Sequence, residues 1–239
     1  MWVAIETSSD RASVAVGRPG AVVAEECVEG ARRHAGALPG LLERALIGAG
    51  ASLRDVERII VGDGPGSFTG LRVGATVAKA LAHTRGIRLA TMPSLLAVAW
   101  AAGPAEGQRV LALFNALRGE VYAAKYRFAA ESVETRLVPS VWLPEALPSS
   151  VPAPDLIAGD IPDALRARLV EWEGGRHPRW VTAVPSAGRF LELAALEGAL
   201  HDVPDAALWE PAYGRPAEAQ AKWEREHGRR LPDSPGHYR

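Results

Sequence analysis

A glycine-dense segment from Gly62 to Gly70 is the part of the chain best suited to chemistry on a phosphate. It reads Gly-Asp-Gly-Pro-Gly-Ser-Phe-Thr-Gly and lies between the apolar run 59–61 and a periodic stretch that begins at Leu71. Glycines let a backbone take positive φ and approach a ligand closely, and the free N–H groups at a helix start bind anions. The segment alone therefore predicts a phosphate-binding turn between a strand and a helix. Its candidate residues are Gly64, Gly66 and Ser67.

A second candidate is the polar turn after the first predicted strand. Glu6, Thr7 and Ser8 follow the apolar run 2–5 and offer a carboxylate and two hydroxyls. This arrangement resembles the first phosphate loop of the actin, sugar-kinase and Hsp70 superfamily, in which a strand-end carboxylate helps to hold a metal. Here the acid is one methylene longer than the aspartate of that pattern. A polar hairpin turn explains the same residues equally well.

Neither a histidine pair nor a nucleophile with its base stands out. The six histidines contain no pair at i and i+4 on a predicted helix, the spacing that places two imidazoles on one helical face. Ser67 lies two residues before Thr69 in the glycine segment, and this is not the nucleophile elbow of hydrolases. Both hydroxyls are interpreted as helix N-caps, because such oxygens accept hydrogen bonds from the first free N–H groups.

The composition of the chain limits the remaining function classes. Among 239 residues, 27 basic and 28 acidic side chains give a net charge of −1, so no overall charge attracts nucleic acid or an anionic membrane. No apolar run approaches the roughly 20 residues of a membrane span, and the N-terminus has no secretory pattern. The single Cys27 excludes an intrachain disulfide. A cytoplasmic protein is the resulting expectation.

Hydrophobic periodicity predicts an α/β fold, in which helices pack on a mostly central sheet. Leucine and alanine repeat at i, i+3, i+4 and i+7 from Leu38 to Ala49, which predicts a helix that stops at Gly50. Pro39 is placed in the first turn of that helix, where a missing N–H is tolerated. Ser94 is predicted to cap a short helix. The predicted strands are 2–5, 12–16, 21–28, 59–61, 88–92, 109–114, 121–128, 135–138, 156–158 and 180–183, and the predicted helices are 38–49, 71–84, 94–102, 163–172 and 189–200.

Small and helix-breaking residues from Ala102 to Gly107 mark a boundary between two predicted lobes. Residues 1–105 are assigned to an N-terminal lobe and residues 106–212 to a C-terminal lobe. Residues 213–239 are polar and are interpreted as a solvated helix with a loose end.

The helix after the glycine segment carries only small side chains along one face. Such a stripe recurs every four residues and permits another helix to approach closely, as in the packing of i±4 ridges. The same periodicity fits packing against the chain's own sheet, and the pattern does not choose between the two. The stripe consists of Gly70, Gly74, Ala78 and Ala82, with Val73, Val77 and Leu81 beside it.

Taken together, these segments resemble the TsaB (YeaZ) family, paralogues of the transferase TsaD with the actin-like two-lobed fold. The most specific match is the block Gly-Pro-Gly-Ser-Phe-Thr-Gly-Leu-Arg within 62–74. The resemblance covers roughly residues 2–215 and implies that each lobe is a mixed sheet flanked by helices. The other matching segments, in family order, are Ile5-Glu6-Thr7-Ser8, Arg33-His34, Ala78-Lys79, Ser94-Leu95, Arg118-Gly119-Glu120-Val121-Tyr122 and Pro211-x-Tyr213-x-Arg215.

The resemblance implies a role in forming N6-threonylcarbamoyladenosine beside the tRNA anticodon, as a non-catalytic partner of TsaD. TsaD transfers the threonylcarbamoyl group and the ATPase TsaE resets the complex, so TsaE and tRNA are expected to be reached only through the complex with TsaD. Proteins of this kind bind TsaD through the first two helices of the N-terminal lobe and form a homodimer when alone. The interface residues implied here are Leu38, Leu42, Gly70, Gly74, Val77, Ala78, Leu81 and Ala82.

The resemblance also implies that the metal centre of TsaD is missing from this chain. TsaD carries paired metal-binding histidines after the strand that corresponds to 88–92, and Ser94 and Val98 occupy those positions here. Serine is a poor metal ligand and valine is none. Glu6 stands where the phosphate-loop pattern has an aspartate, and Asn115 stands where the family often has an aspartate. We therefore expect a vestigial phosphate loop, no metal and no required cofactor, with weak nucleotide binding left open.

Two other functions stay open on the sequence. A nucleotide-hydrolysing enzyme of the actin-like superfamily is favoured by the glycine segment and by Glu6, but it needs Mg²⁺-binding carboxylates that the sequence does not reveal. A metallohydrolase of the M22 type is disfavoured by Ser94 and Val98.

Overall fold

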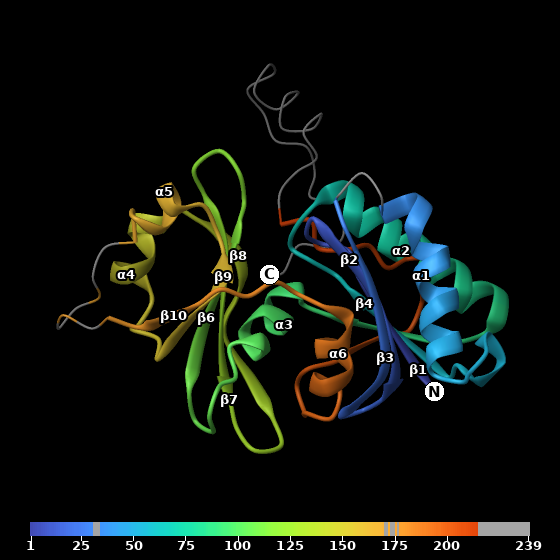
Figure 1. Ribbon diagram of the computed structural model, residues 1–239. Helices are drawn as coiled ribbons and strands as arrows, with labels where there is room; N and C mark the ends of the chain where they lie inside the picture. Colours follow the sequence, from blue (N-terminus) through green and yellow to red (C-terminus); the bar gives the residue numbers. More distant parts are fainter. Residues whose placement is uncertain (31–33, 170–171, 173–174, 176, 215–239) are drawn as a thin grey trace.

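The computed structural model describes residues 1–30, 34–169, 172, 175 and 177–214, and it forms two lobes that are each built on one sheet (Figure 1). The first sheet has six strands in the order β11-β5-β4-β1-β2-β3, and the second has five in the order β10-β9-β6-β7-β8. Arg33 and Arg215 of the family segments, and most of the predicted polar tail, lie outside the described residues.

The strands of the N-terminal half bring the predicted polar segments to one edge of the first sheet. β1 (Trp2–Glu6), β2 (Arg11–Arg18) and β3 (Ala21–Glu29) form an antiparallel meander, and β4 (Arg58–Gly62) and β5 (Arg88–Met92) continue the sheet in parallel with β1. Ile5 lies opposite Val61, and Gly62 lies opposite Met92. Because these three strands run in the same direction, Glu6 and the glycine segment meet at their carboxyl ends.

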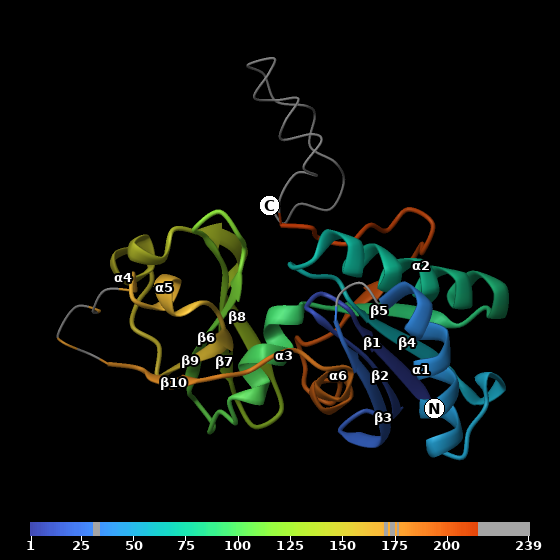
Figure 2. The same cartoon turned by 45° about the horizontal axis from the view of Figure 1, so that its top comes forward.

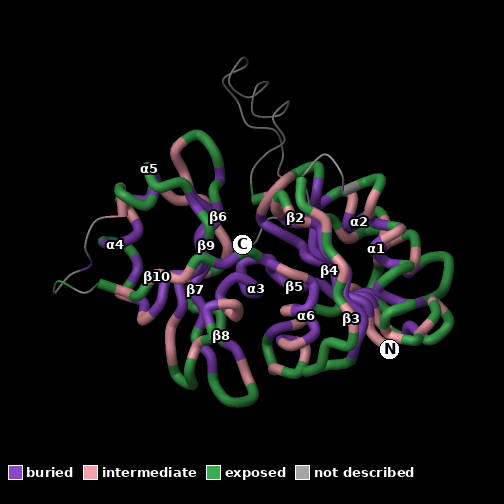
Figure 3. The backbone as a smooth tube through the Cα atoms, in the orientation of Figure 1, coloured by how far each residue is buried: buried purple, intermediate pink, exposed green. Residues whose placement is uncertain are grey.

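Helices cover both faces of the first sheet, and α3 lies between the two lobes (Figures 1 and 2). α1 (His34–Gly48) packs on β2 and β3, and α2 (Phe68–Arg85) packs beside it on β4 and β5. The opposite face carries α6 (Ala187–Leu193), which also contacts α3 (Ser94–Ala101). The buried residues gather in the strands and on the inner sides of these helices (Figure 3).

The second lobe packs its own short helices on the face of its sheet that points away from the first lobe (Figure 1). Burial of Leu111, Leu113 and Trp172 forms the core on that face, whereas α3 covers the other face. No helix in the described ranges is long and apolar enough to cross a membrane. The elements are β6 (Arg109–Asn115), β7 (Val121–Phe128), β8 (Val133–Trp142), η3 (Pro144–Ala146), α4 (Leu147–Ser150), β9 (Leu156–Asp160), α5 (Asp163–Arg166) and β10 (Arg179–Val181).

The structure corrects two local helix predictions. α1 begins at His34, so Pro39 lies inside the helix and not in its first turn. Ala35 and Pro39 are both exposed, so water can reach the carbonyl group that loses its N–H partner. Ser94 is the first residue of α3 and does not cap it, because its hydroxyl donates a hydrogen bond to Glu6.

Two further helices end earlier than predicted, at Arg166 and Leu193. After α6 the chain turns at Gly198, with a φ of 83°, and forms β11 (His201–Val203), which pairs antiparallel with β5 and was not predicted. β11 has a single apolar residue, Val203, so no apolar run marks it in the sequence, whereas the equally short β10 carries Trp180 and Val181. As a result, α6 and β11 belong to the first lobe and not to the second, in which the predicted range 106–212 had placed them.

Candidate functional site

A buried carboxylate stands at the edge where β1, β4 and β5 end. Glu6 is fully buried, Oε1 accepts a hydrogen bond from the Ser8 N–H group, and Oε2 accepts one from the Ser94 hydroxyl at 2.7 Å. Burial raises the pKa of Glu6, and the hydrogen bonds from Ser8 and Ser94 lower it in part. Glu6, Thr7, Ser8 and Ser94 are called the Glu6 cluster. The pairing of Glu6 with Ser94 could not be read from local sequence, because 88 positions separate the two residues.

The glycine segment is a turn between β4 and α2, as predicted. Ser67 is the N-cap of α2, and its Oγ accepts a hydrogen bond from the Gly70 N–H group at 3.2 Å. The Ser67 N–H group donates to the Ser8 carbonyl at 2.7 Å, which ties the turn to β1. Gly64 has a φ of 102°, a conformation that side chains rarely adopt, and this explains the glycine at that position.

The turn and the Glu6 cluster pack directly against each other. A Cβ atom at Gly62 would overlap Glu6 Oε2, and one at Gly66 would overlap the Ser8 carbonyl. Thr7 and Ser8 are themselves buried. The structure therefore brings together the residues predicted for a phosphate loop, and it packs Glu6, Thr7 and Ser8 as a polar core.

Ser94 and Val98, the positions at which the family resemblance implies histidines in TsaD, have different surroundings. Ser94 is fully buried and bonded to Glu6, whereas Val98 is fully buried in the apolar core between the lobes. Within the described ranges, no group of three or more histidine, cysteine, aspartate or glutamate side chains could hold a metal ion.

The segment that ends the described chain covers the glycine turn and links it to the second sheet. The Ala212 N–H group donates to the Asp63 carbonyl at 2.8 Å. The Tyr213 carbonyl accepts a hydrogen bond from the Tyr122 hydroxyl at 3.3 Å, and the Tyr213 ring lies 4.5 Å from the Phe68 ring. In the sequence, only the family resemblance pointed to Tyr213.

The small-residue stripe of α2 packs against this chain's own first sheet. Ala78 is fully buried with the strand residues of that sheet, and a Cβ atom at Gly74 would overlap Thr7 Oγ1. Leu38 of α1 is fully buried in the same core. The close approach that small residues permit is thus used inside the chain, and these positions offer a partner little surface. The predicted interface residues that are buried within the chain are Leu38, Leu42, Gly70, Gly74, Ala78 and Ala82.

One flank of α2 remains at the surface next to α1. Val73, Val77 and Leu81 are half-buried and only partly packed on the core. Pro39 and Glu43 of α1 are exposed. Val77 and Leu81 are therefore the predicted interface residues that a partner could still reach. We call these five residues the α1–α2 surface.

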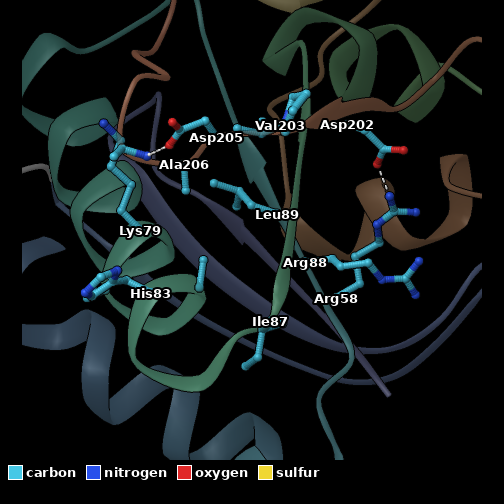
Figure 4. A pocket seen from close by; sticks show the side chains of 14 residues that line it. Arg58, Lys79, His83, Ile87, Arg88, Leu89, Asp202, Val203, Asp205 and Ala206 are labelled. Atoms are coloured by element: carbon cyan, nitrogen blue, oxygen red, sulfur yellow. Dashed lines mark hydrogen bonds and ion pairs between the residues drawn. The ribbon is translucent and has the colours of Figure 1, made fainter.

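A cavity of about 730 Å³ lies on another side of α2, beside β5 and β11 (Figure 4). Lys79 and Leu89 line it, together with an ion pair between Arg58 and Asp202. Lys79 also forms an ion pair with Glu210, at 3.2 Å. The residues predicted for a phosphate loop do not contribute to the described lining of this cavity.

The chain is similar in sequence to proteins of tRNA threonylcarbamoyladenosine biosynthesis. A family model described as TsaD, tRNA N6-adenosine threonylcarbamoyltransferase, matches residues 16–148. The chain is 31% identical over 225 residues to the tRNA threonylcarbamoyladenosine biosynthesis protein TsaB of Bacillus subtilis, which covers 92% of this chain and 96% of that protein. It is 36% identical over 128 residues to TsaB of Escherichia coli, covering 52% of this chain and 54% of that protein.

A solved structure supports the same grouping. YeaZ from Pseudomonas aeruginosa matches with a TM-score of 0.76 and 27% sequence identity, over 89% of this chain and 98% of that chain. With its two mixed sheets flanked by helices, this chain has the predicted actin-like fold.

Proposed function

Because this chain belongs to the TsaB (YeaZ) family of tRNA threonylcarbamoyladenosine biosynthesis proteins, we propose that it acts in this tRNA modification as a non-catalytic partner of TsaD. The observation that carries the proposal is the hydrogen bond between Ser94 and Glu6. A metal site needs donors that are free to face the ion. Here the hydroxyl at one histidine position is already used, and the other position is a buried valine.

The packed Glu6 cluster also supports a role without catalysis. Phosphoryl transfer needs backbone N–H groups and carboxylates that face an open nucleotide site. In this chain the Ser67 N–H group is bonded to Ser8, and Glu6 accepts hydrogen bonds from its own neighbours. No cofactor is required under this proposal, and any nucleotide binding at the contact with TsaD would be weak.

We assign the partner contact to the α1–α2 surface. Its half-buried Val73, Val77 and Leu81 form an apolar ridge with a spacing of four residues, which suits the packing of a second helix. The same surface would join two copies of the chain when TsaD is absent, because an isologous contact uses one patch on both subunits. TsaE and tRNA would then be reached through the complex with TsaD.

The test of this surface is a substitution of Val77 by Glu, compared with Thr76→Glu on the same helix. Position 76 is exposed and lies about 100° away around the helix, so it adds the same charge on a different side. Val77→Glu is expected to abolish co-elution with TsaD and to leave the isolated chain monomeric, whereas Thr76→Glu should retain both contacts. Circular dichroism checks that each variant is folded, and Glu43→Arg provides a second probe of the same surface at an exposed position.

Retention of TsaD by folded Val77→Glu and Glu43→Arg would place the contact elsewhere. The non-catalytic role has a separate test, the ATP turnover of the isolated chain and of the chain with TsaD. Appreciable turnover by the isolated chain would contradict that role and favour the nucleotide-hydrolysing alternative.

A further inference from the structure

A second cavity, of about 670 Å³, opens on the second lobe at the ends of β6, β7 and β8, beside the segment that follows α4. It lies in a different lobe from α1 and α2 (Figure 1). Four basic side chains line it, and Asp155 is the one acid in its described lining. We call it the basic cavity. Its basic residues are Arg109, Lys125, Arg127 and Arg136.

Lys125 is the buried member of this group. It is 4% exposed, and its Nζ donates a hydrogen bond to the Pro152 carbonyl at 2.5 Å. Burial and the neighbouring Arg109 lower the pKa of Lys125. An ammonium group has three donors, and Pro152 is the one acceptor recorded for it in the described structure. A buried cation with donors to spare, on the wall of a cavity, is suited to an anion.

Strand register explains why residues distant in sequence meet here. Arg109 lies opposite Arg127, and Leu111 lies opposite Lys125, so these residues share one face of β6 and β7. Between β7 and β8, Lys125 pairs with Leu137 and Tyr126 pairs with Thr135. Arg136 therefore has no partner in the β7–β8 register and is the extra residue of a β-bulge. Bulges re-aim side chains and are common beside functional sites.

Asp155, the acid in the described lining of the cavity, is paired with Arg109. Asp155 accepts hydrogen bonds from Arg109 Nε at 3.0 Å and from Arg109 Nη2 at 2.9 Å, a bidentate pair that also lowers the pKa of Asp155. Arg136 pairs with the exposed Glu134 at 2.6 Å. Asp155 therefore fixes Arg109 and also attracts Lys125, but Asp155 and Glu134 together offset only two of the four basic charges. The cavity keeps an excess of positive charge that attracts anions.

We propose that the basic cavity is a phosphate-binding site, in which Lys125, Arg127 and Arg136 bind phosphoryl oxygens and Asp155 holds Arg109 in position. Arginine forks match phosphate oxygens bidentately, and a lysine supplies a compact charge. The size of the cavity suits a group larger than a single phosphate. The phosphoryl groups would come from a free nucleotide or from an RNA backbone, two sources of the same chemistry. The site does not depend on the contact with TsaD.

The test measures pyrophosphate and ATP binding by isothermal titration calorimetry, and binding of an unmodified tRNA transcript by fluorescence anisotropy, all on the full chain alone. We expect Lys125→Met to weaken binding about tenfold or more and Arg127→Met to weaken it several-fold. Arg18→Met removes the same charge from an exposed position on β2 of the other lobe and should bind as the wild type does. If Lys125→Met does not fold, the double variant of the exposed Arg127 and Arg136 to Met replaces it.

The pattern of losses identifies the source. Saturable binding of pyrophosphate or ATP that the cavity variants weaken assigns the site to free nucleotides. Tight binding of tRNA alone, weakened by the same variants, assigns it to an RNA backbone. Absence of saturable binding to all three probes overturns the proposal, and so does a loss in Arg18→Met equal to that in the cavity variants. Failure of the TsaD contact would leave these results unchanged, so the two proposals are tested separately.

Discussion

The Glu6 cluster and the basic cavity both bury an ionisable side chain, but they satisfy it in opposite ways. Glu6 accepts hydrogen bonds from Ser8 and Ser94 of the same chain, and the glycine turn packs over it. Lys125 has a single recorded acceptor and lines a cavity that it shares with other cations. A buried charge whose partners are all internal stabilises or strains the fold. A buried charge with donors to spare, beside open space, indicates a ligand from outside.

The largest expected effect tests how tightly the Glu6 cluster is closed. In Gly62→Ala the new Cβ would overlap Glu6 Oε2 and lie 2.9 Å from Ser94 Oγ, so both side chains must move within a packed core. We expect the free energy of unfolding to fall by about 3 kcal/mol, the upper part of the range for overpacking. Urea unfolding followed by circular dichroism measures it.

The matched control is Gly36→Ala in α1, where an added Cβ would meet no atom within 4 Å. Alanine has the higher helix propensity, so this variant should gain about 0.5–1 kcal/mol. Similar stabilities for Gly62→Ala and the wild type would show that the Glu6 cluster is loose, and its contrast with the basic cavity would disappear.

A smaller loss is expected from Ser94→Ala, which removes a donor to Glu6 without adding atoms. An under-satisfied buried carboxylate costs about 1–3 kcal/mol, and we expect a loss near 2 kcal/mol by urea unfolding. Ser149→Ala is the control, because that hydroxyl is exposed and should change stability by less than about 0.5 kcal/mol. Equal stability of the two variants would mean that Ser94 contributes no more than a surface hydroxyl.

The same comparison explains which parts of the molecule the sequence reveals. Apolar runs between turn residues predicted β1, β2, β4 and β5, which are buried almost continuously along their length. Helical periodicity predicted α1 and α2, each of which buries one side. The turn at 62–70 was predicted from its glycines, and Ser67 does cap α2. β11 was missed because Val203 is its single apolar residue, and the early end of α6 was missed because alanine and leucine recur from 194 to 200, past the end of the helix.

Contacts between side chains that are distant in the sequence could not be predicted from periodicity or turn residues. The stripe at Gly74 and Ala78 fitted either a partner or the chain's own sheet, and only tertiary packing decided for the sheet. Ser94 looked like a helix cap until β1 placed Glu6 beside it. The basic cavity could not be predicted, because its residues come from three strands and a loop. A β8 bulge brings Arg136 into it.

Ligand binding at the basic cavity can also be measured through the free energy of unfolding. A ligand that binds only the folded chain stabilises it, by about 1.4 kcal/mol at ten times its dissociation constant. Pyrophosphate at that excess should therefore raise the free energy of unfolding of the wild type by this amount and that of Lys125→Met by much less. Urea titrations with and without pyrophosphate measure the difference at constant ionic strength. An equal increase in both proteins would indicate a general salt effect and not a site at Lys125.

The pH dependence of stability gives the subtlest expected effect, because the hydrogen bonds from Ser8 and Ser94 offset part of the cost of burying Glu6. A folded-state pKa above the unfolded value of 4.5 favours the folded chain fully below that pH, and this contribution is lost as the pH rises through the folded pKa. Glu6→Gln cannot ionise, and its amide can still accept from Ser8 and donate to Ser94. The stability of Glu6→Gln relative to the wild type should therefore increase from pH 4.5 towards neutrality.

Glu145→Gln supplies a control of opposite sign for this series. Arg168 donates a hydrogen bond to Glu145 and lowers its pKa, so that carboxylate stabilises the fold above the unfolded pKa and loses its effect as the pH falls. The wild type should thus exceed Glu145→Gln at neutral pH, and the two should converge in acid. Chemical unfolding at several pH values gives both profiles. If the Glu6→Gln profile followed that of Glu145→Gln, Glu6 would be a stabilised anion, and the Glu6 cluster would have to be considered again as a place for a cation.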